Sequence, residues 1–242
     1  MKRLRCLAAA VAVASVPAVS HAVATVDPAG DLLSTYPGPR GGDLDVVSTD
    51  VLYNGNSFRF NTTLAAPVGT TPGGFYIWGL DRGQGTPRFG QFTVGGNTYD
   101  ARGVLFDSVV ILRPGGPSQV VDLVAGTPPT TLAGSAVSFS GNDLTGSVAA
   151  SLLPSLGLAP SQYTYNLWPR FTSAAVPLVG NAQITDFAPD NSNNVVSSAP
   201  AGTVPVPSTL TLGLLSLAIG VLLGKPRRAE PEPVLGQAAL AA

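Results

Sequence analysis

Four aspartates near the start of the chain have the residue type and the loop surroundings of a cation site. Asp27, Asp31, Asp43 and Asp45 lie close together in glycine-rich loops. Calcium prefers roughly six to eight oxygen ligands from carboxylates and backbone carbonyls. However, the spacing differs from the regular pattern Asp-x-Asp-x-Asp-Gly, and aspartates in turns often cap their own backbone. Turn capping is therefore the favoured alternative and calcium binding the second, and both also apply to two later aspartates, Asp186 and Asp190.

Two tryptophans, Trp78 and Trp168, are candidates for contact with a glycan. An aromatic ring with a polar tip suits a sugar-binding face, and three tyrosines accompany the pair: Tyr76, Tyr163 and Tyr165. The alternative is that these rings form the core of the domain, and it is the favoured one.

The composition of residues 23–207 excludes most of the common catalytic and metal sites. This stretch has no Cys, His, Met, Lys or Glu. A Ser-His-Asp triad, a thiol nucleophile, a disulfide and the usual zinc or haem ligands are therefore excluded there. A pair of aspartates in a glycosidase remains as the least favoured alternative. We expect a protein that is not an enzyme and has no cofactor other than calcium.

The charge of the same stretch argues against nucleic acid as a partner. Its ionisable cations are seven arginines and its acids are twelve aspartates, which give a net charge of −5. Phosphate binding needs a basic surface, and this stretch is acidic.

The spacing of glycine and proline along the chain is typical of an all-β domain. Gly and Pro recur every few residues between short runs of Val, Phe, Tyr and Thr, which predicts an antiparallel β-sandwich of jelly-roll-like type over residues 23–188. The clearest hairpin joins 46–53 to 57–64 through Asn54-Gly55, a dipeptide that favours a type I′ turn. The other expected strands are 74–80, 87–94, 104–112, 119–124, 136–140, 144–149, 163–171 and 183–187. The Asn- and Ser-rich stretch 189–204 is predicted to be a linker.

Three strings in the first half of this domain loosely resemble DOMON-like and family 9 carbohydrate-binding β-sandwiches. They are Asp27-Pro28-Ala29-Gly30-Asp31, then Gly42-Asp43-Leu44-Asp45-Val46-Val47, then Tyr76-Ile77-Trp78-Gly79-Leu80-Asp81. In those domains an acidic early loop precedes the first long strands, so the resemblance also implies a β-sandwich.

The N-terminus has the pattern of a secretory signal peptide over residues 1–22. A basic head with Lys2, Arg3 and Arg5 precedes an apolar stretch and then Ser20-His21-Ala22. We expect cleavage after Ala22 and export of the domain across the inner membrane.

Near the C-terminus, residues 208–224 form an uncharged apolar run. As a helix at about 1.5 Å per residue it would span roughly 25 Å, close to the thickness of a hydrocarbon core. Three cations follow it and should stay on the cytoplasmic side: Lys225, Arg227 and Arg228. The sequence therefore predicts one transmembrane helix, with the domain outside and residues 229–242 as a disordered tail.

The whole segment 205–228 resembles the PEP-CTERM sorting signal of Gram-negative bacteria. The matching residues are Pro205, Val206, Pro207, Ser208, Thr209 and Leu210, followed by the apolar helix and the basic cluster. Val206 stands where the family usually has Glu. The resemblance implies processing by an exosortase, which removes the helix and delivers the protein to the cell exterior, often together with exopolysaccharide and biofilm.

These observations lead to one expectation and one alternative. The expected function is that of a structural or adhesive component of the cell surface or extracellular matrix, or a membrane-anchored domain if the helix is retained. The alternative is a carbohydrate-binding module, with or without calcium.

Overall fold

A computed structural model describes residues 24–199 of the chain. The expected signal peptide, sorting signal and transmembrane helix lie outside these residues. Within residues 24–199, no helix is long and apolar enough to cross a membrane.

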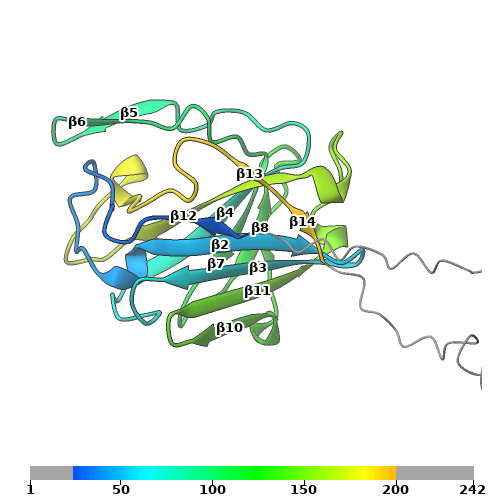
Figure 1. Ribbon diagram of the computed structural model, residues 1–242, viewed down its shortest axis with the longest axis horizontal. Helices are drawn as coiled ribbons and strands as arrows, with labels where there is room; N and C mark the ends of the chain where they lie inside the picture. The colour runs from blue at the N-terminus through cyan, green and yellow to red at the C-terminus, as the bar shows by residue number, and fades with distance from the viewer. Residues whose placement is uncertain (1–23, 200–242) are drawn as a thin grey trace, which may run out of the picture. The chain divides into compact units, whose positions relative to one another are not determined.

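The described residues form two sheets and one separate hairpin, and they contain no α-helix (Figure 1). The first sheet, sheet A, has the order β1-β2-β3-β11-β10, and β14 pairs with the edge of β2. Its strands are β1 (Thr25–Val26), β2 (Val46–Tyr53), β3 (Ser57–Leu64), β10 (Val137–Ser140), β11 (Asp143–Ala149) and β14 (Ser197–Ser198).

The second sheet, sheet B, has the order β13-β12-β4-β7-β8-β9. Its strands are β4 (Gly74–Asp81), β7 (Ser108–Leu112), β8 (Gln119–Asp122), β9 (Thr130–Thr131), β12 (Thr164–Phe171) and β13 (Asn194–Val195). The separate hairpin joins β5 (Gln91–Val94) to β6 (Asn97–Asp100). Five short 3₁₀ turns complete the elements: η1 (Gly42–Leu44), η2 (Gly134–Ala136), η3 (Ala150–Leu152), η4 (Pro160–Gln162) and η5 (Gly180–Gln183).

This arrangement confirms the expected all-β class with antiparallel sheets, and it fits a β-sandwich. All strand pairs are antiparallel except β14 with β2. The predicted hairpin of 46–53 and 57–64 is present as β2 and β3. At its turn Gly55 has φ of 95°, and Asn54 Oδ1 accepts hydrogen bonds from the N–H groups of Asn56 and Ser57. The hairpin therefore lies where the sequence predicts it, but its turn is not of type I′. That type needs positive φ at two central residues, and among residues 24–199 Asn191 is the one non-glycine residue with positive φ.

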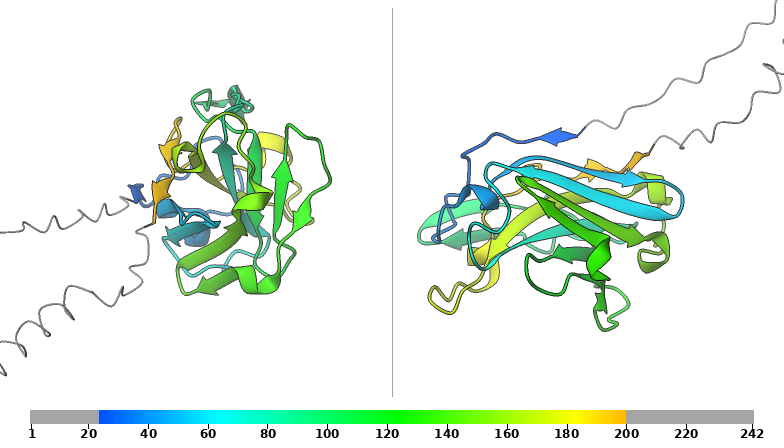
Figure 2. Two further views of the ribbon diagram at one scale, coloured as in Figure 1. Left: turned by 90° about the vertical axis from the view of Figure 1, so that its right-hand side faces the viewer. Right: turned by 90° about the horizontal axis from the view of Figure 1, so that it is seen from below.

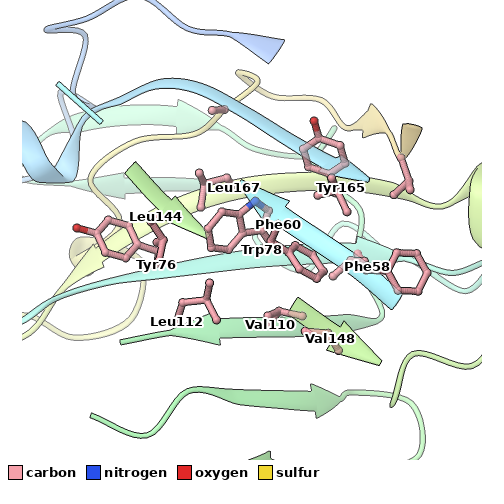
Figure 3. Close-up of a cluster of buried hydrophobic side chains, with 14 of the residues drawn as sticks. Phe58, Phe60, Tyr76, Trp78, Val110, Leu112, Leu144, Val148, Tyr165 and Leu167 are labelled. Carbon is pink, nitrogen blue, oxygen red and sulfur yellow. The ribbon is translucent and has the colours of Figure 1, made fainter. Parts of the chain in front are cut away.

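The core between the sheets is built from alternating residues of both. Phe58 and Phe60 of β3 and Trp78 of β4 are fully buried there. Trp78 lies in the middle of this cluster and meets Phe60 edge-on, with ring centroids 5.7 Å apart (Figure 3). Its Nε1 donates to Thr49 Oγ1 at 3.1 Å, so the one polar atom of the ring is satisfied.

The second apolar cluster covers the opposite face of sheet B. It contains Phe75 and Ile77 of β4 and Trp168 of β12, packed with Phe106 and Phe187 from loops. Phe92 and Tyr99 of the β5–β6 hairpin pack against it. Because sheet B is buried on both faces, the residues of β4 and β12 are buried almost without a break, whereas burial alternates along β3.

Gly79 marks the closest approach in the second cluster. A Cβ added to Gly79 would lie 2.3 Å from Cη2 of Trp168 and 3.0 Å from Cβ of Phe106. The absence of a side chain on β4 at this point therefore makes room for the Trp168 ring on the neighbouring strand.

A buried ion cluster closes one end of sheet B. Arg82, directly after β4, is fully buried and donates from Nε to Asp107 Oδ1 at 2.7 Å. Its Nη2 donates to Asp122 Oδ2 at 2.9 Å, and its Nη1 donates to the carbonyl of Pro154 at 3.3 Å. The backbone carbonyl of Arg82 accepts from the N–H groups of Leu156 and Leu158. One arginine thus joins β4 and β8 to the loops that contain Asp107 and Pro154.

The prediction of a linker from residue 189 onward is wrong for residues 189–199. This stretch contains β13 and β14, and Val196 between them is part of the core. Its amide side chains bond backbone groups elsewhere: Asn193 Nδ2 donates to the carbonyl of Leu105, and Asn191 Oδ1 accepts from Gly103 N–H. Polar composition suggested a solvated linker, but these amides hold a neighbouring loop in place.

Both ends of the described domain lie along one strand. Thr25 of β1 pairs with Thr49 of β2, and Ser198 of β14 pairs with Tyr53 of the same strand. Figure 2 shows β1 in dark blue and β14 in orange at the same side of the domain.

Candidate metal centre

Three aspartates from distant parts of the chain meet at the start of β2. One carboxylate oxygen of each of Asp27, Asp31 and Asp186 lies within 4.8 Å of the others. Asp27 follows β1 directly, Asp31 lies in the loop after it, and Asp186 lies between two residues that bridge to β12, Ile184 and Ala188. We call these three residues the acidic cluster.

Backbone hydrogen bonds fix the orientation of Asp186. Its Oδ2 accepts from Val46 N–H at 2.9 Å, and its Oδ1 accepts from Phe187 N–H at 2.8 Å. Asp45 lies beside the cluster, and its Oδ2 accepts from Gly30 N–H at 2.7 Å. The loop between Asp27 and Asp31 is thereby tied to the beginning of β2.

Two buried carboxylate oxygens at this place have no hydrogen-bond partner. They are Oδ2 of Asp27, a residue that is 6% exposed, and Oδ1 of Asp45. No positive side chain compensates them, since the ion pairs found within residues 24–199 are Arg82 with Asp107 and Asp122, and Arg102 with Asp100. A buried carboxylate without a partner is strongly unfavourable, because it has lost its hydration.

The electrostatics of the cluster reflect this lack of compensation. Burial, and then the facing carboxylate of Asp186, raise the pKa of Asp27 to about 8. Burial also raises the pKa of Asp186 to about 7, although its hydrogen bond from Val46 opposes the shift. The pKa values of Asp31 and Asp45 are raised as well, mainly by burial. Four carboxyl groups therefore resist ionisation together, which is the situation that a bound cation relieves.

The donor set determines which cation fits. All the side-chain donors are carboxylate oxygens on loops, which suit a hard cation such as calcium, and backbone carbonyls and water complete such shells. Asp31 is exposed while Asp27 and Asp186 are buried, so an ion could reach the two buried carboxylates from the solvent at Asp31.

The four aspartates predicted from the sequence divide between the two alternatives. Asp27 and Asp31 belong to the acidic cluster, and Asp45 lies next to it. Asp43 instead caps a turn, because its carboxylate accepts from Gly69 N–H, Thr71 N–H and the Thr71 hydroxyl. Asp186 becomes the third member, although its sequence neighbours gave no signal that it meets Asp27. Asp190 accepts a hydrogen bond from the Tyr99 hydroxyl at 2.6 Å.

The tryptophans are placed in the core. Trp78 and Trp168 are buried on opposite faces of sheet B, because the register pairs Trp78 with Leu167 and Trp168 with Ile77. They cannot form one platform, and neither ring offers a face to a sugar. Trp78 and Trp168 are therefore core residues, as the favoured alternative predicts, and they give no support to a glycan-binding face.

A shallow groove of about 390 Å³ lies elsewhere, between the β7–β8 turn and β10. Ser118, Leu132, Val137 and Phe139 are among its lining residues, and none of the aspartates of the acidic cluster lines it. A glycosidase needs two carboxylates that flank a sugar in a cleft, whereas Asp27 and Asp186 are only 6% and 2% exposed. The geometry thus suits cation binding better than hydrolysis.

No protein-family model, curated protein or solved structure matches this chain. The functional inference therefore rests on the residues of the chain itself.

Proposed function

We propose that the chain is an exported calcium-binding β-sandwich, of jelly-roll-like type, that serves as a structural or adhesive component of the cell surface or extracellular matrix. The observation that carries calcium binding is the acidic cluster of Asp27, Asp31 and Asp186. Its carboxylates converge, and within residues 24–199 they form no ion pair, while the buried Oδ2 of Asp27 has no hydrogen-bond partner there. A divalent cation would supply the missing charge and the missing partner.

The proposed location rests on the two ends of the sequence. The signal-peptide pattern ending at Ala22 supports export, and the resemblance of 205–228 to a PEP-CTERM signal supports sorting by an exosortase. Association with exopolysaccharide follows from the same resemblance. Extracellular calcium-binding modules have dissociation constants of roughly 0.1–1 mM. A cluster of three carboxylates on loops is suited to binding in that range.

Calcium is expected to raise the free energy of unfolding of the domain. If the ion binds only the folded state, calcium at about 100 times its dissociation constant adds about 2.7 kcal/mol. The measurement is urea unfolding in EGTA and in a calcium series, together with calorimetric titration of Ca²⁺ into the folded protein.

Asp27→Asn is the informative variant, because the buried Oδ2 of Asp27 accepts no hydrogen bond from residues 24–199 that the change would break. It removes the need either to protonate the Asp27 carboxyl group on folding or to bury its charge beside the other carboxylates. In EGTA the variant should therefore unfold at higher urea concentration than the wild type, and it should lose the response to calcium. Asp143→Asn is the matched control, since Asp143 lies on β11 outside the cluster and should keep the full response. Identical unfolding of the wild type with and without calcium would refute the cation site.

The sorting proposal predicts a defined mature protein. Intact-mass spectrometry of envelope and culture-medium fractions from the producing cells should find a species that begins at Val23 and ends near Pro205 to Ser208. A species that begins at Val23 and still ends at Ala242 would contradict processing and would indicate a permanently anchored domain.

A further inference from the structure

The acidic cluster joins two parts of the chain that differ in how firmly they are held. Asp27 and Asp31 belong to residues 24–31, which we call the N-terminal segment. Asp186 is held by backbone N–H groups of Val46 and Phe187, both within the body of the domain. A cation at the cluster would therefore bind the segment and the body at the same time.

Few hydrogen bonds attach the N-terminal segment to the body. In β1, Thr25 and Val26 pair with two residues of β2. Asp27 N–H donates to the carbonyl of Val47 at 2.9 Å, and Gly30 N–H donates to Asp45 Oδ2 at 2.7 Å. The Thr25 hydroxyl also meets the Tyr165 hydroxyl at 3.4 Å and the Asn194 amide. Each such bond contributes only modestly, because water replaces it when the segment leaves.

Apolar burial does not anchor the segment either. Val26 is 80% exposed, residues 28–31 are also exposed, and the first buried apolar side chain along the chain is Leu33. Asp27 is the one fully buried residue of the segment, and it faces other carboxylates. Without a cation, docking of the segment therefore either brings like charges together or requires protonation of a carboxyl group, and it buries little apolar surface in return.

We propose that calcium at the acidic cluster locks the N-terminal segment onto β2, so that the calcium concentration decides whether this segment is docked. The proposal rests on the calcium binding proposed above and adds its structural consequence. Release of the segment would uncover the edge of β2 at Ser48 and Thr49, because β1 is the strand that covers these residues. A free strand edge is a site for pairing with another chain, so the bound cation would also protect this edge.

The size of the effect follows from mass action. A cation that binds only the docked form, present at about 100 times its dissociation constant, raises the ratio of docked to undocked molecules about 100-fold. Export from a calcium-poor to a calcium-rich compartment would therefore complete the edge of the sheet after translocation.

Hydrogen exchange of the protein purified from its producing cells tests this inference at two amides, those of Asp27 and Gly30. In EGTA both should exchange at least about tenfold faster than in saturating calcium. Amides of Phe60 in β3 and Trp78 in β4, in the middle of the two sheets, should exchange slowly in both conditions. In Asp27→Asn the segment should be protected in EGTA and should not respond to calcium, whereas Asp143→Asn should behave as the wild type.

The outcomes separate this inference from the function on which it rests. If titration detects calcium binding but both amides exchange slowly in EGTA, the segment is docked without the cation and the lock is refuted, while the cation site stands. If titration detects no calcium binding, both proposals fail.

Discussion

Replacement of Arg82 by methionine should lower the free energy of unfolding by about 3–5 kcal/mol, because it leaves a buried carboxylate without its counter-ion. The guanidinium group donates to Asp107 and Asp122 at 2.7 and 2.9 Å, and both Arg82 and Asp107 are fully buried. Asp107 would keep the backbone N–H groups of Arg82 and Gln84 but would lose the one positive side chain that contacts it within residues 24–199. Methionine preserves most of the side-chain stem, so the loss reports the charge rather than a cavity. Urea unfolding followed by fluorescence measures it.

Two further variants separate this explanation from a general sensitivity to arginine replacement. Arg102→Met removes an exposed ion pair, since the Arg102 side chain is 67% exposed, and it should leave the urea midpoint unchanged. Asp107→Asn combined with Arg82→Met removes the stranded charge and should recover part of the loss. A change below about 1 kcal/mol in Arg82→Met would show that the ion cluster does not hold the end of sheet B together.

Trp78→Ala should also lower the free energy of unfolding by about 3–5 kcal/mol, the usual range for removal of a buried aromatic side chain. The ring fills the space between the two sheets against Phe60, and its loss would also leave Thr49 Oγ1 without the Nε1 donor (Figure 3). Because the chain has two tryptophans, Trp168 remains as the single tryptophan whose fluorescence reports unfolding.

The control for this variant is an aromatic residue on the surface. Phe139 of β10 is 38% exposed, so Phe139→Ala should destabilise the protein much less. Equal destabilisation by the two variants would contradict the central position of Trp78 in the core.

The all-β class could be predicted because its signals are local. Asn54-Gly55 determines the turn between β2 and β3, and the alternation through Phe58 and Phe60 determines which face of β3 is buried. In β4 the same reasoning fails, because Phe75 to Leu80 is buried on both sides and no alternation distinguishes the faces. The sequence therefore could not show that Trp78 and Trp168 point to opposite clusters.

The candidate site was predictable only in part, for a related reason. Asp27 and Asp31 lie four residues apart in a glycine-rich loop, so their proximity is visible in the sequence. Asp186 joins them through the pairing of distant strands, and Asp43 leaves them because Gly69 and Thr71 supply three donors to its carboxylate. Tertiary contacts decide which aspartates lack hydrogen-bond donors, and these contacts cannot be predicted from residue type and spacing.

Because β1 and β14 both pair with β2, the two ends of the described domain lie close together. At about 3.3 Å per residue, the partners of Thr25 and Ser198 on β2 lie roughly 13 Å apart, and by their pairing directions both chain ends point toward Tyr53. Asp45 precedes the opposite end of β2, about 26 Å from Tyr53 by the same rise. Both ends of the described domain therefore lie toward the Tyr53 end of β2, and the acidic cluster lies at the Val46 end. A force applied to the chain beyond β14 would first separate the short edge strands β14 and β13 from their sheets. Only then would it act on the hydrogen bonds between the long strands.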